Sequence, residues 1–262
     1  MSFRRVFLLL CIALAPGCSV LEERMLCPCF LTLDLGEVDS ELLMEEGAAS
    51  LDWALWQGER SGGCAEEGSE LLSALPGSLE LQASRDTSLD IIFCSSAGAG
   101  GSLIVPQGKD CQPIYGATLH YPGGIDTVSD TLRLHRQYAR IYFYFKGGAQ
   151  SFSIVTLQGD CCGYNSDLSI ARGPFSVRLM PDKTSSCSAA VPRQDGTDLT
   201  LCLQAAGGEC RYFAIGNYIL AGGYDWSAPD LDDIYIEIDC VASRVSLYSD
   251  LWQRSVTFTV TL

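Results

Sequence analysis

The sequence predicts an all-β protein made of two β-sandwich domains in tandem. Short runs of alternating, β-branched or aromatic residues dominate the chain, and helical periodicity is scarce. Turns rich in Gly, Pro and Asp separate these runs, which is typical of sandwich domains. A Lys-Gly-Gly break at residues 146–148 divides the runs into two series. We therefore expect one sandwich over residues 30–148 and a second over residues 149–262.

The first series begins with Phe30-Leu-Thr-Leu-Asp-Leu, an alternating strand. One short helix is expected over residues 40–48, because Ser40 supplies an N-cap and acidic residues fill the first turn. The run at 89–94 is apolar except for Asp90 and is expected to be buried on both sides. The strands predicted for this half are 30–35, 51–56, 78–82, 89–94, 102–105, 132–135 and 140–145.

The second series repeats this pattern after the glycine break. Its last seven residues alternate without exception, with Val, Phe, Val and Leu on one face and threonines on the other. We therefore expect the chain to end within a strand. The strands predicted for this half are 151–157, 175–179, 199–203, 234–238 and 256–262.

The N-terminus has the layout of a secretory signal. Arg4 and Arg5 precede about a dozen mostly apolar residues, and Ala-Pro-Gly17 leads into Cys18. This run is short of the ~20 residues that span a bilayer. The Gly17-Cys18 junction resembles the lipobox of bacterial lipoproteins, in which the cysteine is acylated and becomes the first mature residue. We expect a signal peptide over 1–17, cleavage between Gly17 and Cys18, lipid on Cys18 and a tether over 18–29; a plain cleaved signal is the alternative.

Charge excludes one class of partner. The chain carries a net charge of −15, and loss of Arg4 and Arg5 with the signal leaves the mature chain near −17. Nucleic-acid binding needs Lys and Arg to neutralise phosphates, so no nucleic-acid partner is expected. An anionic membrane would also repel this chain. Lipid, rather than electrostatic attraction, must hold it at a membrane.

Cysteine is abundant, with thirteen in the chain. Cys11 leaves with the signal and Cys18 takes the lipid, so eleven remain. An exported chain with this many cysteines is expected to contain disulfides. Eleven is an odd number, so at least one cysteine stays free or pairs with another chain. The connectivity is open.

Two cysteine pairs are candidate disulfide residues. Cys27 and Cys29 flank a proline, and Cys161 and Cys162 are adjacent. We expect each of the four to form a separate structural bridge, because proline in a three-residue span resists an internal bond. A redox pair is the alternative.

No motif for catalysis or for a cofactor stands out. The two histidines, His120 and His135, match neither zinc spacing nor a catalytic triad, and the chain has no Gly-x-Ser-x-Gly elbow. Acidic residues gather at 225–233, where calcium binding is the alternative to a solvated loop. We expect no enzyme, metal or cofactor. The alternative binding feature is a sugar-stacking platform built from Trp53, Trp56, Trp226 and Trp252.

The segment after Cys18 resembles the start of a known family. Two glutamates and an arginine at 22–24 precede Cys27-Pro28-Cys29 and then Phe30-Leu-Thr-Leu-Asp-Leu. This order resembles the FimB-like fimbrial anchor family of Bacteroidales outer-membrane lipoproteins. Residues 134–141 and 223–231 also resemble stretches of that family. The resemblance implies two transthyretin-like sandwiches over most of the mature chain, exposed on the outer membrane.

The resemblance also implies a function and partners. It implies a surface lipoprotein that anchors a fimbrial shaft to the outer membrane and ends its assembly by non-covalent binding of a shaft subunit, a fimbrillin. Its partners would be that subunit and, through acylated Cys18, outer-membrane lipid. Strand addition to an open sheet edge would supply such a grip. The alternative is a glycan-binding surface lipoprotein of a nutrient-uptake system, with affinity from aromatic side chains.

Overall fold

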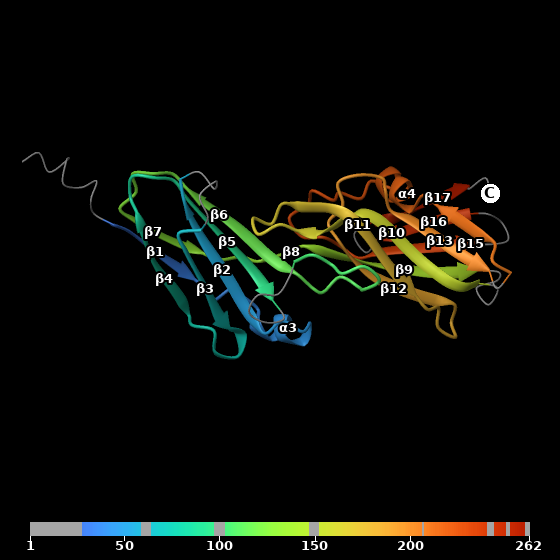
Figure 1. Ribbon diagram of the computed structural model, residues 1–262, viewed down its shortest axis with the longest axis horizontal. Helices are drawn as coiled ribbons and strands as arrows, with labels where there is room; N and C mark the ends of the chain where they lie inside the picture. The colour runs from blue at the N-terminus through green and yellow to red at the C-terminus, as the bar shows by residue number, and fades with distance from the viewer. Residues whose placement is uncertain are drawn as a thin grey trace, which may run out of the picture.

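The structure of the protein is a computed structural model, and it describes residues 28–58, 64–96, 103–146, 152–205, 207–239, 244–249 and 252–259. These residues form four β-sheets, so the expected all-β class is confirmed. Figure 1 shows the sheets as two lobes that follow one another along the longest axis. Gly17, Cys18 and Cys27 lie outside the described residues. Within the described ranges, no helix has the length and apolar character needed to cross a bilayer.

The first sandwich packs a three-stranded sheet against a five-stranded sheet. Its strands are β1 (Pro28–Asp34), β2 (Ser50–Gln57), β3 (Glu66–Leu71), β4 (Ser78–Ser84), β5 (Leu89–Ser96), β6 (Tyr115–Tyr121), β7 (Thr127–Thr131) and β8 (His135–Arg136). The sheet orders are β4-β1-β7 and β3-β2-β5-β6-β8. In β1, Leu31 and Leu33 are buried and the residues between them are exposed, as the alternation predicts.

A short helix, α3 (Ser40–Glu45), covers one end of this sandwich. Its N-cap is Asp39 rather than the expected Ser40, since the Asp39 carboxylate accepts a hydrogen bond from the Leu42 N–H at 3.0 Å. The helix buries Leu43 and is followed by Gly47 with φ +94°, a conformation that favours glycine. A single 3₁₀ turn, η3 (Leu72–Ala74), lies against it.

The second sandwich packs a four-stranded sheet against a five-stranded sheet. Its elements are β9 (Tyr138–Lys146), β10 (Phe152–Tyr164), β11 (Ile170–Leu179), β12 (Ser186–Pro192), β13 (Thr200–Ala205), β14 (Cys210–Phe213), α4 (Ile215–Ala221), β15 (Ile234–Asp239), β16 (Arg244–Ser249) and β17 (Trp252–Thr259). The sheet orders are β11-β10-β13-β14 and β12-β9-β15-β16-β17. Ile141 of β9 and Ile234 of β15 pair in parallel and are both buried.

Strand β9 belongs to the second sandwich, although the expected boundary at 148/149 assigned it to the first. Tyr138, Ile141 and Phe143 join the hydrophobic core of the second sandwich, and β9 pairs with β12 and β15. The change of core therefore falls between β8 and β9. A glycine break predicts a turn between two strands but carries no information about which sheet each strand joins.

The segment 103–111 crosses from the first sandwich onto the second. Residues 102–105 were expected to form a strand, but the described part of this segment makes only an isolated bridge between Ile104 and Gly163. Leu103 O accepts from Tyr164 N at 3.1 Å, and Val105 N donates to Cys162 O at 2.7 Å. The crossing coincides with a β-bulge in β10, where its register with β11 shifts.

Candidate docking groove between two sheet edges

A groove opens on the second sandwich between the outer strands of its two sheets. β11 is the outer strand of one sheet and β12 is the outer strand of the other. The segment 103–111 lies across the gap between these strands and fills part of it. Beyond this segment a groove of about 580 Å³ remains, lined by both strands and by residues 108–110.

Main-chain groups of both strands face this groove. Gly108 N donates to Ser176 O of β11 at 2.6 Å, and Cys111 N donates to Ala190 O of β12 at 3.2 Å. The N–H and C=O of one residue point to the same side of an antiparallel strand, and this side alternates along the chain. The main-chain groups of Arg178 and Ser188 therefore also face the groove. Within the described ranges, neither has a main-chain partner on that side.

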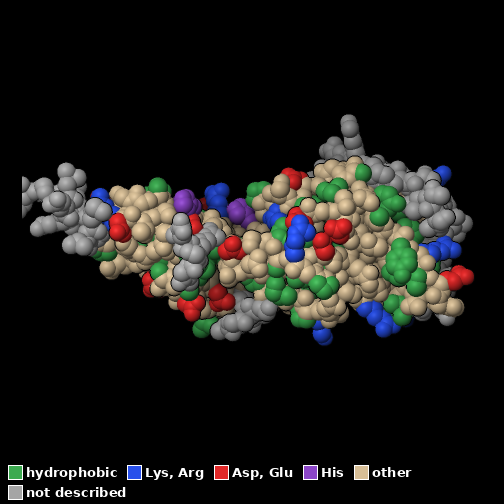
Figure 2. Space-filling view, turned by 45° about the horizontal axis from the view of Figure 1, so that its top comes forward, with side chains coloured by type: hydrophobic (Ala, Val, Ile, Leu, Met, Phe, Trp, Pro, Cys, Tyr) green, Lys and Arg blue, Asp and Glu red, His purple; other side chains and the backbone are tan. Residues whose placement is uncertain are grey.

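The side chains of the groove are mixed in character. Tyr144 is 42% exposed and Met180 is 71% exposed, so both offer apolar surface. Tyr142 stacks on Tyr235 with ring centroids 4.9 Å apart. Charged neighbours complete the lining: Lys109, Asp110, Arg178 and Asp182. Figure 2 likewise shows separate hydrophobic patches on the second lobe, interspersed with basic and acidic side chains. Unpaired strand edges beside apolar side chains are the arrangement that strand addition uses.

Two titratable groups of the groove, Asp182 and Cys187, each keep one charge state near neutral pH. The Asp182 carboxylate accepts hydrogen bonds from the hydroxyl groups and backbone N–H groups of Thr184 and Ser186, which lowers the pKa of Asp182 to about 2. Burial raises the pKa of the Cys187 thiol to about 12. The carboxylate stays ionised and the thiol stays protonated, so these two groups suit binding rather than nucleophilic chemistry.

The candidate disulfide cysteines lie in different places. Cys29 is buried in the first sandwich, and burial raises the pKa of its thiol. Cys161 and Cys162 are both buried in the second sandwich, where Cys162 joins the hydrophobic core and Cys161 Sγ faces Asp195. All nine described cysteines, these three among them, are free thiols in the structure.

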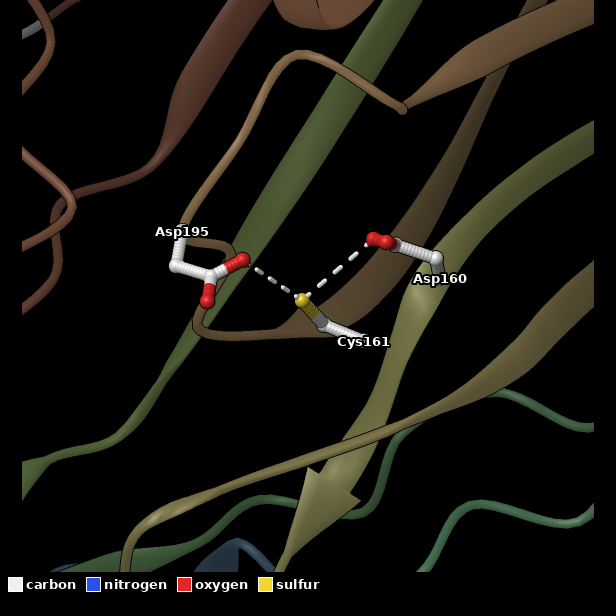
Figure 3. Close-up of side chains that lie close together, drawn as sticks. All are labelled: Asp160, Cys161 and Asp195. Atoms are coloured by element: carbon white, nitrogen blue, oxygen red, sulfur yellow. Dashed lines mark hydrogen bonds between the residues drawn. The ribbon is translucent and has the colours of Figure 1, made fainter.

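Cys161 lies between two carboxylates in the only cluster of metal-ligand type found among the described residues. Figure 3 shows its Sγ pointing toward Asp195, at 3.3 Å, and toward Asp160. Arg172 bridges the two carboxylates with ion pairs of 3.1 Å and 2.5 Å. Burial raises the pKa of Cys161 to about 12; the Asp195 carboxylate adds to this rise, and a backbone hydrogen bond at Asp195 opposes it. A bound arginine and a protonated thiol make this a satisfied structural cluster, and the residues do not favour a metal ion.

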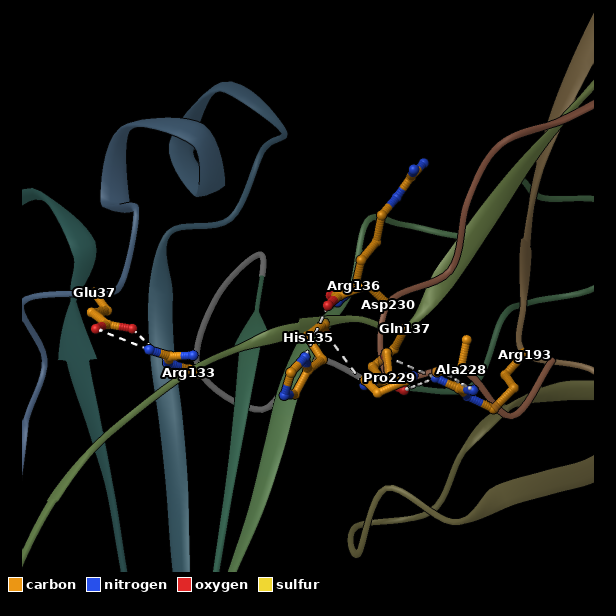
Figure 4. A network of polar contacts seen from close by, with 9 residues as sticks. All are labelled: Glu37, Arg133, His135, Arg136, Gln137, Arg193, Ala228, Pro229 and Asp230. Atoms are coloured by element: carbon orange, nitrogen blue, oxygen red, sulfur yellow. Dashed lines mark hydrogen bonds and ion pairs between the residues drawn. The ribbon is translucent and has the colours of Figure 1, made fainter. Parts of the chain in front are cut away.

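The acidic segment 225–233 holds the junction between the sandwiches. Asp230 accepts from Arg136 N at 2.7 Å and lies 3.0 Å from His135 Nδ1, while Asp233 pairs with the Arg136 guanidinium at 2.6 Å. Arg133, just before, pairs with Glu37 of the first sandwich at 2.6 Å (Figure 4). These carboxylates therefore bind protein cations, and the calcium alternative has no support from this geometry.

Arg193 fixes the same segment from the second sandwich. Its guanidinium donates to the backbone oxygens of Trp226, Ala228 and Pro229 and to the Gln137 side chain. Figure 4 shows the contacts with Ala228, Pro229 and Gln137. Four acceptors on two separate segments converge on one planar cation, which lysine lacks the geometry to reproduce.

Replacing Arg193 by alanine is expected to destabilise the protein by about 2–3 kcal/mol, because it leaves several half-buried acceptors without a donor. The melting temperature should fall by roughly 4–12 °C. Arg193→Lys keeps the charge and should lie between the parent and the alanine variant. Calorimetry of the three proteins checks this, and an alanine variant as stable as the parent would contradict the junction role.

The tryptophan platform is not formed by the described side chains. Trp53 and Trp56 are each 8% exposed and Trp226 is 5% exposed, so all three belong to the interior. The Trp53 ring lies directly over Gly68 of β3, where a Cβ atom would come within 2.4 Å of it. The side chain of Trp252 lies outside the described residues.

The two histidines are surface groups paired with carboxylates. His120 lies on β6, with its Nδ1 2.6 Å from Asp90 of the neighbouring β5. His135, on β8, pairs with Asp230. In the described part of the chain, both histidines therefore face carboxylates.

Comparison with solved structures identifies the fold of the protein. No protein-family model matches the chain, and no curated protein matches it. The structure has the fold of solved fimbrial and adhesin proteins of Bacteroidales, so the fold part of the predicted resemblance is confirmed.

The fimbrial anchor protein Mfa2 from Porphyromonas gingivalis superposes with a TM-score of 0.60 at 11% identity, over 86% of this chain and 98% of that one. A candidate polysaccharide-binding protein from Bacteroides thetaiotaomicron gives a TM-score of 0.55 at 11% identity, over 90% and 98% of the two chains. A candidate adhesin from Bacteroides ovatus gives 0.55 at 12% identity, over 88% and 95%. At identities this low, the structural similarity establishes a common fold alone.

Proposed function

We propose that the protein is a surface lipoprotein that anchors a fimbrial shaft to the outer membrane and terminates its assembly by binding a shaft subunit non-covalently. The observation that carries this proposal is the match to the fold of a fimbrial anchor over nearly the whole length of both chains. The open groove supports it, because it offers a subunit two strand edges at once. We propose no enzymatic activity, since Asp182 and Cys187, the groove groups with strongly shifted pKa values among the described residues, favour binding over nucleophilic chemistry.

The first sandwich is built to resist a pulling force applied at its N-terminus. The last two residues of the expected tether, Pro28 and Cys29, already belong to β1, which lies between β4 and β7 and is hydrogen-bonded along both sides. Force that enters at the N-terminus therefore meets many backbone hydrogen bonds at once. β11 and β12, the strands that border the groove, lie in the other lobe (Figure 1), so the subunit would bind the lobe that does not contain β1.

An extended segment of the shaft subunit is the occupant we propose for the groove. The protein's own segment 103–111 already bridges β11 and β12 farther along the same gap. A partner strand would continue that line past Arg178 and Ser188, with Tyr144 and Met180 contacting its side chains. Main-chain hydrogen bonds would supply affinity and the side-chain contacts specificity.

The test of the anchoring role is removal of the protein from the cells that produce it. Fimbriae should then be released into the medium, and their length should increase because assembly has lost its terminating subunit. Electron microscopy of cells and of the cleared medium measures both effects. Fimbriae that stay on the cell at unchanged length would refute the proposal.

A proline at Ser188 tests the groove. The Ser188 N–H faces the groove rather than β9, so Ser188→Pro removes one donor while leaving the sheet intact. Binding of purified shaft subunit should weaken roughly tenfold, from the lost hydrogen bond and the bulk of the ring. Ser188→Ala keeps the N–H and should bind as the parent does. Calorimetric titration makes the comparison, and equal binding by a correctly folded proline variant would rule this groove out.

Glycan binding is the second candidate function, and one comparison favours it, the candidate polysaccharide-binding protein of the same fold. The buried tryptophans do not serve it, so the exposed ring of Tyr144 would have to. Titration of the protein with surface and dietary polysaccharides separates the two functions. Binding that disappears in Tyr144→Ala would favour the glycan function.

A further inference from the structure

Two cysteines lie side by side on the outer face of one β-hairpin. In the β13–β14 ladder, Cys202 pairs with Tyr212 and Gln204 pairs with Cys210. Cys202 and Cys210 are therefore diagonal neighbours on one face, since side chains two residues apart on a strand point the same way. Leu201 and Leu203 point the other way and are fully buried.

The two side chains lie next to each other on this face, and Tyr212, directly opposite Cys202, shares it. Cys210 is exposed and Cys202 is partly buried. Among the described cysteines, no other pair occupies opposite or diagonal positions of a strand ladder. Diagonal Cα atoms are typically about 7–8 Å apart, just beyond the roughly 4.4–6.8 Å of a disulfide, so closing the bond requires the edge strand β14 to move toward β13 by about 1 Å.

We propose that Cys202 and Cys210 form a disulfide in the exported protein, an inference that rests on the proposed surface location. Export places the chain where disulfides form and persist. The bond would close a ring around the seven residues 203–209 of the hairpin. A metal is the other use for two adjacent thiols, but no third ligand accompanies them in the part of the chain that the structure describes.

The bond forms by exchange with a disulfide oxidant, such as an oxidised thiol–disulfide oxidoreductase or oxidised glutathione. The exposed Cys210 thiolate attacks one sulfur of the oxidant and releases its first thiolate. The Cys202 thiolate then attacks Cys210 Sγ, the new S–S bond forms, and the second thiolate of the oxidant leaves. The two cysteines lose two protons and two electrons, which reduce the oxidant to two thiols.

The bond would link β14, a short edge strand of the sandwich that carries the groove, covalently to β13. β14 has four residues, of which three are exposed, and it pairs only with β13 at the edge of its sheet. Short edge strands open at low free-energy cost. A disulfide at the first residue of β14 limits that opening and leaves the buried faces unchanged.

Trypsin isolates the pair in one peptide. Cleavage after Arg193 and Arg211 releases residues 194–211, which contain Cys202, Cys210 and no other cysteine. The full-length chain is equilibrated with reduced and oxidised glutathione, quenched with acid, alkylated without reduction, digested and weighed. A second sample is taken directly from the cells. We expect both to give a non-alkylated peptide two hydrogen atoms lighter than the dithiol.

The outcomes separate this inference from the anchoring role. Two alkyl groups on the glutathione-treated peptide, or a link from either cysteine to another, would overturn the pairing whatever the location of the protein. A bond that forms in glutathione but is absent from the cell sample would overturn its presence in the native protein, and would count against export. Fimbrial release reports on anchoring independently of both.

Stability supplies a second measurement. Reduction of the parent should lower its melting temperature by roughly 5 °C, from the lost loop constraint. Cys202→Ser and Cys210→Ser should each start from the lower temperature and lose less on reduction. Cys64→Ser, at another exposed cysteine, should behave like the parent. A Cys202→Ser variant with the same response to reduction as the parent would contradict the proposal.

Discussion

Replacing Cys18 by alanine is expected to move the protein from the membrane fraction to the soluble fraction and to release fimbriae with it. Each buried methylene of an acyl chain contributes about 0.8 kcal/mol, so the lipid outweighs all other contacts of this acidic chain with a membrane. The described part of the chain contains no helix suited to replace it. Fractionation of cells, followed by detection of the protein and of the shaft subunit, measures the result.

Cys11 provides the matched control for this experiment. It lies inside the apolar run of the signal, so Cys11→Ala removes a cysteine without touching the cleavage junction. This variant should stay in the membrane fraction with its fimbriae attached. A Cys18→Ala protein that remains with the membrane after a high-pH wash would show that something other than lipid holds it.

Replacing Gly163 by alanine is expected to be the most destabilising single change in the second sandwich. Gly163 has φ +138°, and an added Cβ would lie 2.0 Å from Leu103 O and 3.0 Å from Ile104 Cα. Both contacts are with backbone, which cannot rotate away. Strain in the strand and displacement of the crossing segment together cost about 4 kcal/mol. The melting temperature should fall by roughly 8–16 °C.

Gly77→Ala is the control for this change. Gly77 has no positive φ, and nothing lies within 4 Å of the position its Cβ would take. Its melting temperature should match that of the parent within a degree or two. Thermal unfolding of the three proteins tests the prediction. A Gly163→Ala variant that unfolds with the parent would mean that segment 103–111 does not cross β10 as described.

Most strands with strong alternation could be predicted from the sequence. Two of the strands that were missed, β6 and β12, contain glycine or small residues, which weaken the strand pattern. β6 contains Gly116, where a Cβ would come within 2.7 Å of the Leu168 side chain, so close packing demands a residue that weakens the strand pattern. β12 is built from small residues, and Ala189 and Ala190 are completely buried. Their low strand propensity conceals a strand that packing determines.

The candidate site was less predictable than the fold. The sequence drew attention to cysteine pairs, histidines, acidic residues and tryptophans, and most of these have structural partners. The groove is lined by Arg178, Met180, Ser186 and Ser188, none of which forms a motif. Its defining groups are main-chain N–H and C=O groups, which every residue but proline carries. No sequence signal could therefore have located them.

The sequence by itself determined the all-β class, the buried face of each alternating strand and the predicted export signal that ends at Cys18. These properties are local, because hydrophobic periodicity and composition are written in consecutive residues. Only the tertiary structure decided that β1 pairs with β7, that β9 joins the second sandwich beside β15, and that β11 and β12 remain open at the edge. Strand pairing uses backbone groups that are alike at every position, so packing between distant segments chooses the partners and leaves the unpaired edge.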